Sequence, residues 1–174
     1  PEAIQRALAF VALTLMMTWQ QLASPFAVGD TGDPLFSIWR LSWVAHQLPR
    51  DPLRLFDGNI FYPELRTLAY SDAMLATALM AAPLLWLGVH QVLVYNVVLL
   101  VSFAASGIAM YALVRALTGD RAAAFVAGVA FAFYPFRFEH YSHLELQVTF
   151  WMPLALLMID LDRFKEVNDT LGHY

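Results

Sequence analysis

The sequence predicts an all-α, polytopic helical membrane protein, and three features of its composition support this fold class. Of the 174 residues, 60% are hydrophobic and 14% are charged, whereas soluble domains average roughly 45 to 50% apolar and about 25% charged residues. Several windows contain the roughly 20 apolar residues that cross a bilayer core. The chain has no cysteine, which excludes disulfides, thiolate metal sites and cysteine nucleophiles. We therefore expect the lipid bilayer as the main partner, and no nucleic acid.

The predicted spans follow the apolar runs in chain order. The first covers about residues 7–23, and because no charged segment or small-residue cleavage site accompanies it, we expect a retained span rather than a signal peptide. Residues 91–114, 122–134 and 146–160 are three further spans. Residues 73–87 are short for a full crossing and form either a re-entrant segment or a short span.

A long polar stretch, Pro25–Asp72, separates the first span from the rest. Asp33-Pro34 is typical of a helix start, with Asp as N-cap and Pro at the first helical position, and Asp51-Pro52 repeats the pattern. The tryptophan-containing segment Leu35–Leu48 is predicted to be an interfacial helix in this first outer loop. Its polar residues fall roughly on one stripe: Ser37, Arg40, His46 and Gln47.

The orientation follows from the Lys and Arg residues near the span ends, which favour the cytoplasm. If residues 73–87 are re-entrant, all of the flanking basic residues lie on the cytoplasmic side: Arg6, Arg115, Arg121, Arg163 and Lys165. Both termini are then cytoplasmic, in what we expect to be a bacterial inner membrane. The same arrangement brings residues 25–90 and 137–147 together as one polar surface on the outer side.

Four segments carry a family resemblance: Gly29-Asp30-Thr31-Gly32-Asp33-Pro34, Asn59–Pro63, Leu68–Asp72 and Leu113–Gly119. Over residues 7–157 their order resembles the N-terminal part of the GT-C superfamily of membrane glycosyltransferases, and bacterial multi-span proteins related to them. The resemblance implies sugar transfer from a polyprenyl-phosphate donor, with Asp30 or Asp33 as the base. Substrate binding is expected from Asp72 and from arginines that can hold a lipid phosphate: Arg40, Arg66 and Arg137.

The same acids have simpler explanations in local structure. Asp33 and Asp72 suit helix caps, and Asp30 suits a glycine-rich turn. A second polar patch follows in residues 137–147, where Glu139 and His143 are four positions apart and, together with His140 and Glu145, could bind a metal. Polar side chains at a membrane interface are the alternative that we favour for this patch.

Residues 159–174, from Ile159-Asp160-Leu161-Asp162-Arg163-Phe164-Lys165 to Gly172-His173-Tyr174, closely resemble the opening of a GGDEF diguanylate cyclase domain. The resemblance implies a magnesium ion at Asp160, a triphosphate facing Phe164 and Lys165, and guanine at Asn168. The glycine-rich turn and the second metal carboxylate are absent, and about 20 residues of an α/β domain cannot bury a core. We therefore expect this incomplete tail not to bind GTP usefully. Residues 154–161 form either the first cyclase strand or the end of the last membrane helix.

These observations predict a GT-C-like membrane region over residues 1–158 and an incomplete GGDEF-like start over residues 159–174. The leading hypothesis is a partial glycosyltransferase-like membrane protein that is not catalytically competent by itself. Its alternatives are a membrane-anchored diguanylate cyclase truncated after its first strand, and a non-enzymatic membrane protein. Residues 153–158 fit both families, so a hybrid joined at this apolar stretch is a further possibility. No cofactor follows from the residues beyond the magnesium that the resemblance implies.

Overall fold

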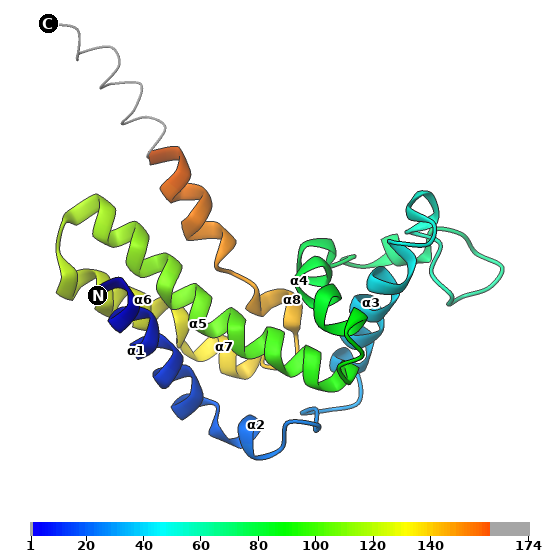
Figure 1. Ribbon diagram of the computed structural model, residues 1–174, viewed down its shortest axis with the longest axis horizontal. Coiled ribbons are helices and arrows are strands. Elements are labelled where there is room, and N and C mark those ends of the chain that lie inside the picture. Colours follow the sequence, from blue (N-terminus) through cyan, green and yellow to red (C-terminus); the bar gives the residue numbers. More distant parts are fainter. Residues whose placement is uncertain (1, 161–174) are drawn as a thin grey trace, which may run out of the picture. The chain divides into compact units, whose positions relative to one another are not determined.

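The computed structural model describes residues 2–160, and Figure 1 traces the chain. The described residues form helices, turns and loops and contain no β-strand, so the predicted all-α class is confirmed. They divide into two compact units. Unit 1 comprises residues 2–17, 102–139 and 148–160, and unit 2 comprises residues 18–101 and 140–147. Each unit is described by itself below.

Unit 1 contains α1 (Glu2–Met17), the C-terminal part of α5 (Gln91–Thr118), α6 (Arg121–Ala132), α7 (Pro135–Glu139) and a helical segment over residues 151–160. The turn between α5 and α6 is capped by Asp120, whose Oδ1 accepts hydrogen bonds from the backbone N–H groups of Ala122 and Ala123 at 2.8 and 3.2 Å. These bonds satisfy two N–H groups that have no partner within the helix.

The core of unit 1 is built around Phe10 of α1, which is fully buried. Its ring lies 5.3 Å from that of Phe125 on α6 and 6.3 Å from that of Tyr111 on α5, centroid to centroid. Two glycines leave room for it: a Cβ added at Gly107 would approach the Phe10 ring to 2.5 Å, and one at Gly128 would do the same. The added Cβ at Gly128 would also lie 2.7 Å from the Gly107 carbonyl oxygen, so α5 and α6 approach each other closely at these glycines.

Two helical segments are long and apolar enough to cross a membrane: Gln91–Thr118, with 28 residues, and Arg121–Glu139, with 19. They correspond to the predicted spans 91–114 and 122–134. By length and composition these are candidates for membrane spans, and α4 (Leu75–Trp86) is, as expected, too short for a full crossing.

Unit 2 contains α2 (Trp19–Ala23), α3 (Asp33–Gln47), α4, the N-terminal part of α5 and α8 (Leu144–Gln147), with 3-10 turns η1 (Pro52–Arg54) and η2 (Thr67–Tyr70). In Figure 1, α3 and α4 lie side by side. The α3 side chains that are buried recur every three or four residues: Pro34, Ser37, Ile38, Arg40, Leu41, Val44 and Ala45. The facing side of α4 is made of small residues, Thr77, Ala78, Ala81 and Ala82, which allow the two helices to pack closely.

Two predicted spans are interrupted in the structure. Residues 7–23 form two helices because Thr18 leaves the helical conformation, with φ −116° and ψ 26°. In residues 146–160 the helix of residues 151–160 is separated from α8 by Val148, Thr149 and Phe150. There the Thr149 hydroxyl lies 3.1 Å from Ser106 Oγ, and the Phe150 ring is buried. The first break is a local change of backbone conformation at Thr18, and the second is accompanied by a tertiary contact of Thr149. A run of apolar residues in the sequence indicates neither.

Candidate functional site

The candidate site lies in unit 2, on the face of α3 that carries Asp33, Ser37 and Arg40. Their spacing of four and then three residues aligns these side chains along one side of a helix. The loop at Asp72 and the segment His140–Gln147 supply the remaining groups. The expectation that the two polar stretches meet is confirmed for this segment. Residues 137–139 belong to unit 1.

Arg40 is the centre of the cluster and is only 2% exposed. Its Nη2 donates to Glu145 Oε2 at 3.1 Å and to Ser37 Oγ at 2.9 Å, and its Nη1 donates to the Asp72 carbonyl oxygen at 2.8 Å. The guanidinium carbon lies 4.6 Å from the centroid of the Phe36 ring. The buried cation therefore joins α3 to the Asp72 loop and to the start of α8, and it compensates the charge of Glu145.

The predicted polar stripe on α3 is therefore wrong in part. Ser37 and Arg40 are buried, whereas His46 is exposed and Gln47 is partly exposed. The reason is that Arg40 finds a carboxylate and a carbonyl inside unit 2, so its burial does not leave an uncompensated charge.

His143 links the two acids of the cluster. Its Nδ1 lies 3.3 Å from Asp33 Oδ2 and 3.9 Å from Glu145 Oε1. The Asp33 side chain is 52% exposed, so it contacts solvent as well as the imidazole. The prediction that Asp33 is an N-cap is wrong: α3 begins at Asp33 with Gly32 as its N-cap, and no side chain caps it. The carboxylate faces His143 instead.

The segment that carries His143 is held to unit 2 by further hydrogen bonds. Tyr95 Oη donates to the Ser142 carbonyl oxygen at 3.0 Å, and Gln147 Nε2 donates to the His140 carbonyl oxygen at 2.6 Å. Burial raises the pKa of Tyr141 to about 12, because the ionised phenolate would lose its hydration. The imidazole therefore sits on an ordered turn.

Two other predicted acids are engaged in local turns. Asp30 Oδ1 accepts a hydrogen bond from the Gly32 N–H at 2.8 Å, as expected for the glycine-rich turn. Asp72 Oδ1 accepts from the Met74 N–H at 2.9 Å. It does not occupy the N-cap position, because α4 begins at Leu75 with Met74 as N-cap. The contribution of Asp72 to the cluster is its carbonyl oxygen.

The predicted phosphate-binding arginines are not brought together with Arg40. Arg66 is exposed, with a positive φ of 58°, and its backbone N–H donates to Asp57 Oδ1 at 3.1 Å. Arg137 belongs to unit 1 and is fully buried, with its guanidinium carbon 4.1 Å from the Phe103 ring centroid and its Nη1 3.1 Å from the Ala132 carbonyl oxygen. Arg40 is the one of these arginines for which the structure gives an ion pair with an acid of the candidate site, at 3.1 Å from Glu145 within residues 2–160.

Within residues 2–160, no group of three or more His, Asp or Glu side chains is placed to hold a metal ion. Glu139 and His143 do not share a helix face, because α7 ends at Glu139. Asp160 ends the described helical segment and lines a cavity of about 220 Å³ with Leu113, Leu117, Leu156 and Ile159. The predicted nucleotide-binding residues lie outside the described residues: Phe164, Lys165 and Asn168.

Sequence reasoning placed Ser37 on the polar stripe without giving it a role in a site, and it did not single out Tyr95, although both support the cluster. Ser37 lies three residues before Arg40 on the same helix, and this spacing was the available signal. Comparison with protein-family models, curated proteins and solved structures finds no match. The function is therefore argued from the geometry of the chain itself.

Proposed function

We propose that this chain is part of an integral membrane glycosyltransferase of GT-C-like architecture that uses a lipid-linked sugar donor. The observation that carries the proposal is the pairing of Asp33 with His143 beside the part-buried Arg40–Glu145 pair. It combines a solvent-facing carboxylate, an ordered imidazole and a fixed positive charge in one cluster. Glycosyl transfer to a hydroxyl group requires a base that removes the hydroxyl proton.

The two carboxylates of the cluster have different partners and can therefore have different roles. Glu145 is occupied by Arg40 at 3.1 Å, so much of its acceptor capacity is used. Asp33 contacts only the imidazole among the ionisable partners described and is half exposed. A carboxylate at Nδ1 favours the imidazole tautomer in which Nε2 carries the lone pair. Either Asp33 itself or His143 oriented by Asp33 can then accept a proton from an acceptor hydroxyl.

The membrane location is part of the same proposal. It is supported by Gln91–Thr118 and Arg121–Glu139, which are long and apolar enough to cross a bilayer. At 1.5 Å per residue, the first of these extends about 42 Å, which exceeds the hydrocarbon thickness of about 30 Å. The Trp39 and Trp43 side chains on α3 suit an interfacial helix that presents Asp33 to a membrane-bound substrate.

Replacing Asp33 by Asn in the full-length protein tests the proposal. With a polyprenyl-phosphate-linked sugar as donor, we expect turnover to fall by at least about 100-fold, since general-base catalysis contributes about 10² to 10⁴. Asp51→Asn is the matched control, because Asp51 is another carboxylate of the same loop and pairs only loosely with Arg54 at 3.9 Å. Asp30→Asn separates the two predicted bases. Unchanged turnover of Asp33→Asn in an active full-length enzyme would reject the assignment.

A diguanylate cyclase is the second candidate function, and it is favoured by the specific sequence of residues 159–174 alone. Residues 151–160 are helical, and most of the resembling segment lies outside the described residues. Sequencing of the intact genomic locus through codons 140–174 and beyond separates the candidates. A frame that continues into a glycine-rich GGDEF turn supports the cyclase, and one that continues into further apolar spans supports the transferase.

A further inference from the structure

A loop with exposed apolar side chains lies in unit 2 between η1 and η2, and it extends beyond α3 in Figure 1. Four of its large residues form what we name the loop-tip patch: Phe61, Tyr62, Leu65 and Tyr70. The Phe61 and Tyr70 rings are stacked, 6.2 Å apart between centroids. Tyr62 is 97% exposed and Leu65 is 70% exposed. Exposed apolar groups that lie together mark a surface that contacts a partner.

The base of this loop is closed and packed. The Leu68 N–H donates to the Phe56 carbonyl oxygen at 3.0 Å, and the Thr67 hydroxyl donates to the Gly58 carbonyl oxygen at 3.1 Å. Thr67 and Leu68 are themselves buried. The loop-tip patch is therefore carried by a folded base, and its exposure is a property of an ordered loop.

Two tryptophans of α3 hold the loop along that helix. Trp39 Nε1 donates to Asn59 Oδ1 at 2.9 Å, and Trp43 Nε1 donates to the Leu55 carbonyl oxygen at 2.8 Å. The loop and α3 thus form one piece, so whatever contacts the loop tip also positions α3.

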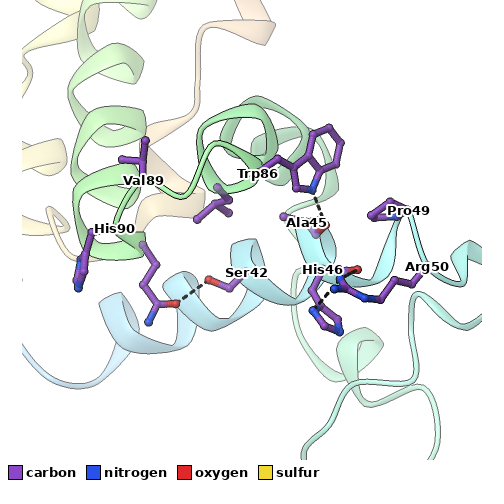
Figure 2. Close-up of a pocket in the computed structure, with 10 residues that line it drawn as sticks. Ser42, Ala45, His46, Pro49, Arg50, Trp86, Val89 and His90 are labelled. Atoms are coloured by element: carbon purple, nitrogen blue, oxygen red, sulfur yellow. Dashed lines mark hydrogen bonds between the residues drawn. The ribbon is translucent and has the colours of Figure 1, made fainter.

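The same helix is joined to the first residue of a candidate membrane span, Gln91–Thr118. Ser42 Oγ donates to Gln91 Oε1 at 3.0 Å, and Trp86 Nε1 donates to the Ala45 carbonyl oxygen at 2.8 Å (Figure 2). At about 42 Å, the span is longer than the hydrocarbon core of about 30 Å. When it crosses a bilayer, its first residue lies in the headgroup region or beyond it, and α3 lies at the level of the membrane surface.

The chemistry of the loop fits a lipid interface. Tyrosine is enriched at the headgroup level, where the ring contacts apolar groups and the hydroxyl stays in water. Two arginines and two acids balance the charge of residues 53–70: Arg54, Asp57, Glu64 and Arg66. The segment therefore has no charge of one sign that would steer it to a charged macromolecule.

We propose that the loop-tip patch inserts into the headgroup region of the bilayer, with the Tyr62 hydroxyl kept in water, and so holds α3 at the membrane surface. The inference rests on the membrane location within the proposed function. It does not depend on the Asp33–His143 pair or on sugar transfer. A second copy of this chain is the other occupant that the test distinguishes.

The test uses the full chain in phosphatidylcholine vesicles. The chain has no cysteine, so Tyr62→Cys and Leu65→Cys each carry a single nitroxide label in the patch. Electron paramagnetic resonance measures the collision rate of the label with oxygen, which concentrates in lipid, and with a water-soluble nickel chelate. We expect an oxygen-to-nickel ratio several-fold higher than at Arg54→Cys. Arg54 is the matched control, because its charged side chain is well exposed in the same segment.

A label in the candidate span separates failure of the inference from failure of the membrane location. Val101→Cys carries it, because Val101 is exposed and lies inside α5. If the Val101 ratio is high while the ratios at Tyr62 and Leu65 equal that at Arg54, the loop lies in water and the inference fails alone. A low ratio at Val101 would reject the membrane location, and the inference with it.

Burial of the patch by protein gives a different result. Low collision rates with both reagents at residues 62 and 65 would overturn the proposal, because protein would then cover the patch. Dipolar broadening that disappears on dilution with unlabelled chain would identify a second copy as the occupant. The Leu65 label keeps the test valid if Tyr62→Cys disturbs the loop, and circular dichroism checks the helix content of every variant.

Discussion

The two units of this chain place different residues at their centres. In unit 1 the fully buried Phe10 ring occupies a space that Gly107 and Gly128 leave open. In unit 2 the nearly fully buried Arg40 is surrounded by a carboxylate, a hydroxyl and a carbonyl oxygen. Close packing holds the first centre, and charge compensation and hydrogen bonds hold the second.

The difference shows how one buried cation can bring acids together in an apolar chain. Unit 1 also buries an arginine, Arg137, but the contacts that the structure gives for it are with the Phe103 ring and the Ala132 carbonyl oxygen. The positive charge of a buried guanidinium must be compensated by polar or charged partners. Arg40 donates hydrogen bonds to the Glu145 carboxylate and to the Asp72 carbonyl oxygen. Glu145 in turn lies beside His143, which faces Asp33. The candidate site is thus assembled around one buried cation, whereas Phe10 packs against the aromatic rings of Tyr111 and Phe125.

Replacing Arg40 by Met should have the largest effect on stability. Removing one partner of a buried ion pair costs about 3 to 5 kcal/mol, and we expect about 3 kcal/mol here, at the low end, because the Glu145 side chain is 22% exposed. The free energy of unfolding of the full chain in detergent, from denaturant titration followed by circular dichroism, measures the effect.

A double variant separates charge compensation from packing. In Arg40→Met/Glu145→Met neither charge remains unpaired, so most of the lost stability should return. Arg54→Met is the control, because its pairing with Asp51 at 3.9 Å is exposed and such pairs contribute about 0 to 1 kcal/mol. If the double variant is as unstable as Arg40→Met, packing rather than charge holds the centre of unit 2.

Gly128→Ala is the corresponding change in unit 1. The added methyl group would lie 2.5 Å from the Phe10 Cζ and 2.7 Å from the Gly107 carbonyl oxygen. A side chain can turn away, but the carbonyl can move only with its helix, so we expect a loss of about 1 to 3 kcal/mol, as for other overpacked cores. Thermal unfolding in detergent should show the loss as a lower Tm.

Gly29→Ala is the matched control for this substitution. No heavy atom lies within 4 Å of a Cβ added at Gly29, so the methyl group should be tolerated. Equal Tm values for the two alanine variants would mean that α5 and α6 can separate without cost, and that close packing does not define unit 1.

The helices were the part of the structure that the sequence predicted best. Long apolar runs anticipate α5 and α6 because their length and composition are local properties. The break at Thr18 was missed because a single residue with non-helical dihedral angles leaves the apolar window unchanged. The break before residue 151 was missed because it involves Ser106, which is 43 positions from Thr149.

The candidate site was predicted in its residue types and only partly in its pairings. Asp33, Arg40 and His143 were all singled out from the sequence, but Asp33 was also explained as a cap and Arg40 was placed on a polar stripe. The contact between Arg40 and Glu145 spans 105 positions, and no local pattern encodes it.

The smallest predicted effect concerns Tyr141 and extends the comparison to pH. Burial raises the pKa of this phenol from its usual value of 10.0 to about 12, so the folded chain binds more protons than the unfolded chain between these values. Stability should therefore fall as pH rises from about 10 to 12. Tyr141→Phe should reduce this slope, whereas Tyr62→Phe should not, because the Tyr62 side chain is already in solvent, with 97% of the residue exposed.

The free energy of unfolding, measured at several pH values in this window, gives the slope. An unchanged slope in Tyr141→Phe would mean that the segment carrying His143 opens to water in the folded protein, and that the charged centre of unit 2 is less ordered than the Phe10 core of unit 1.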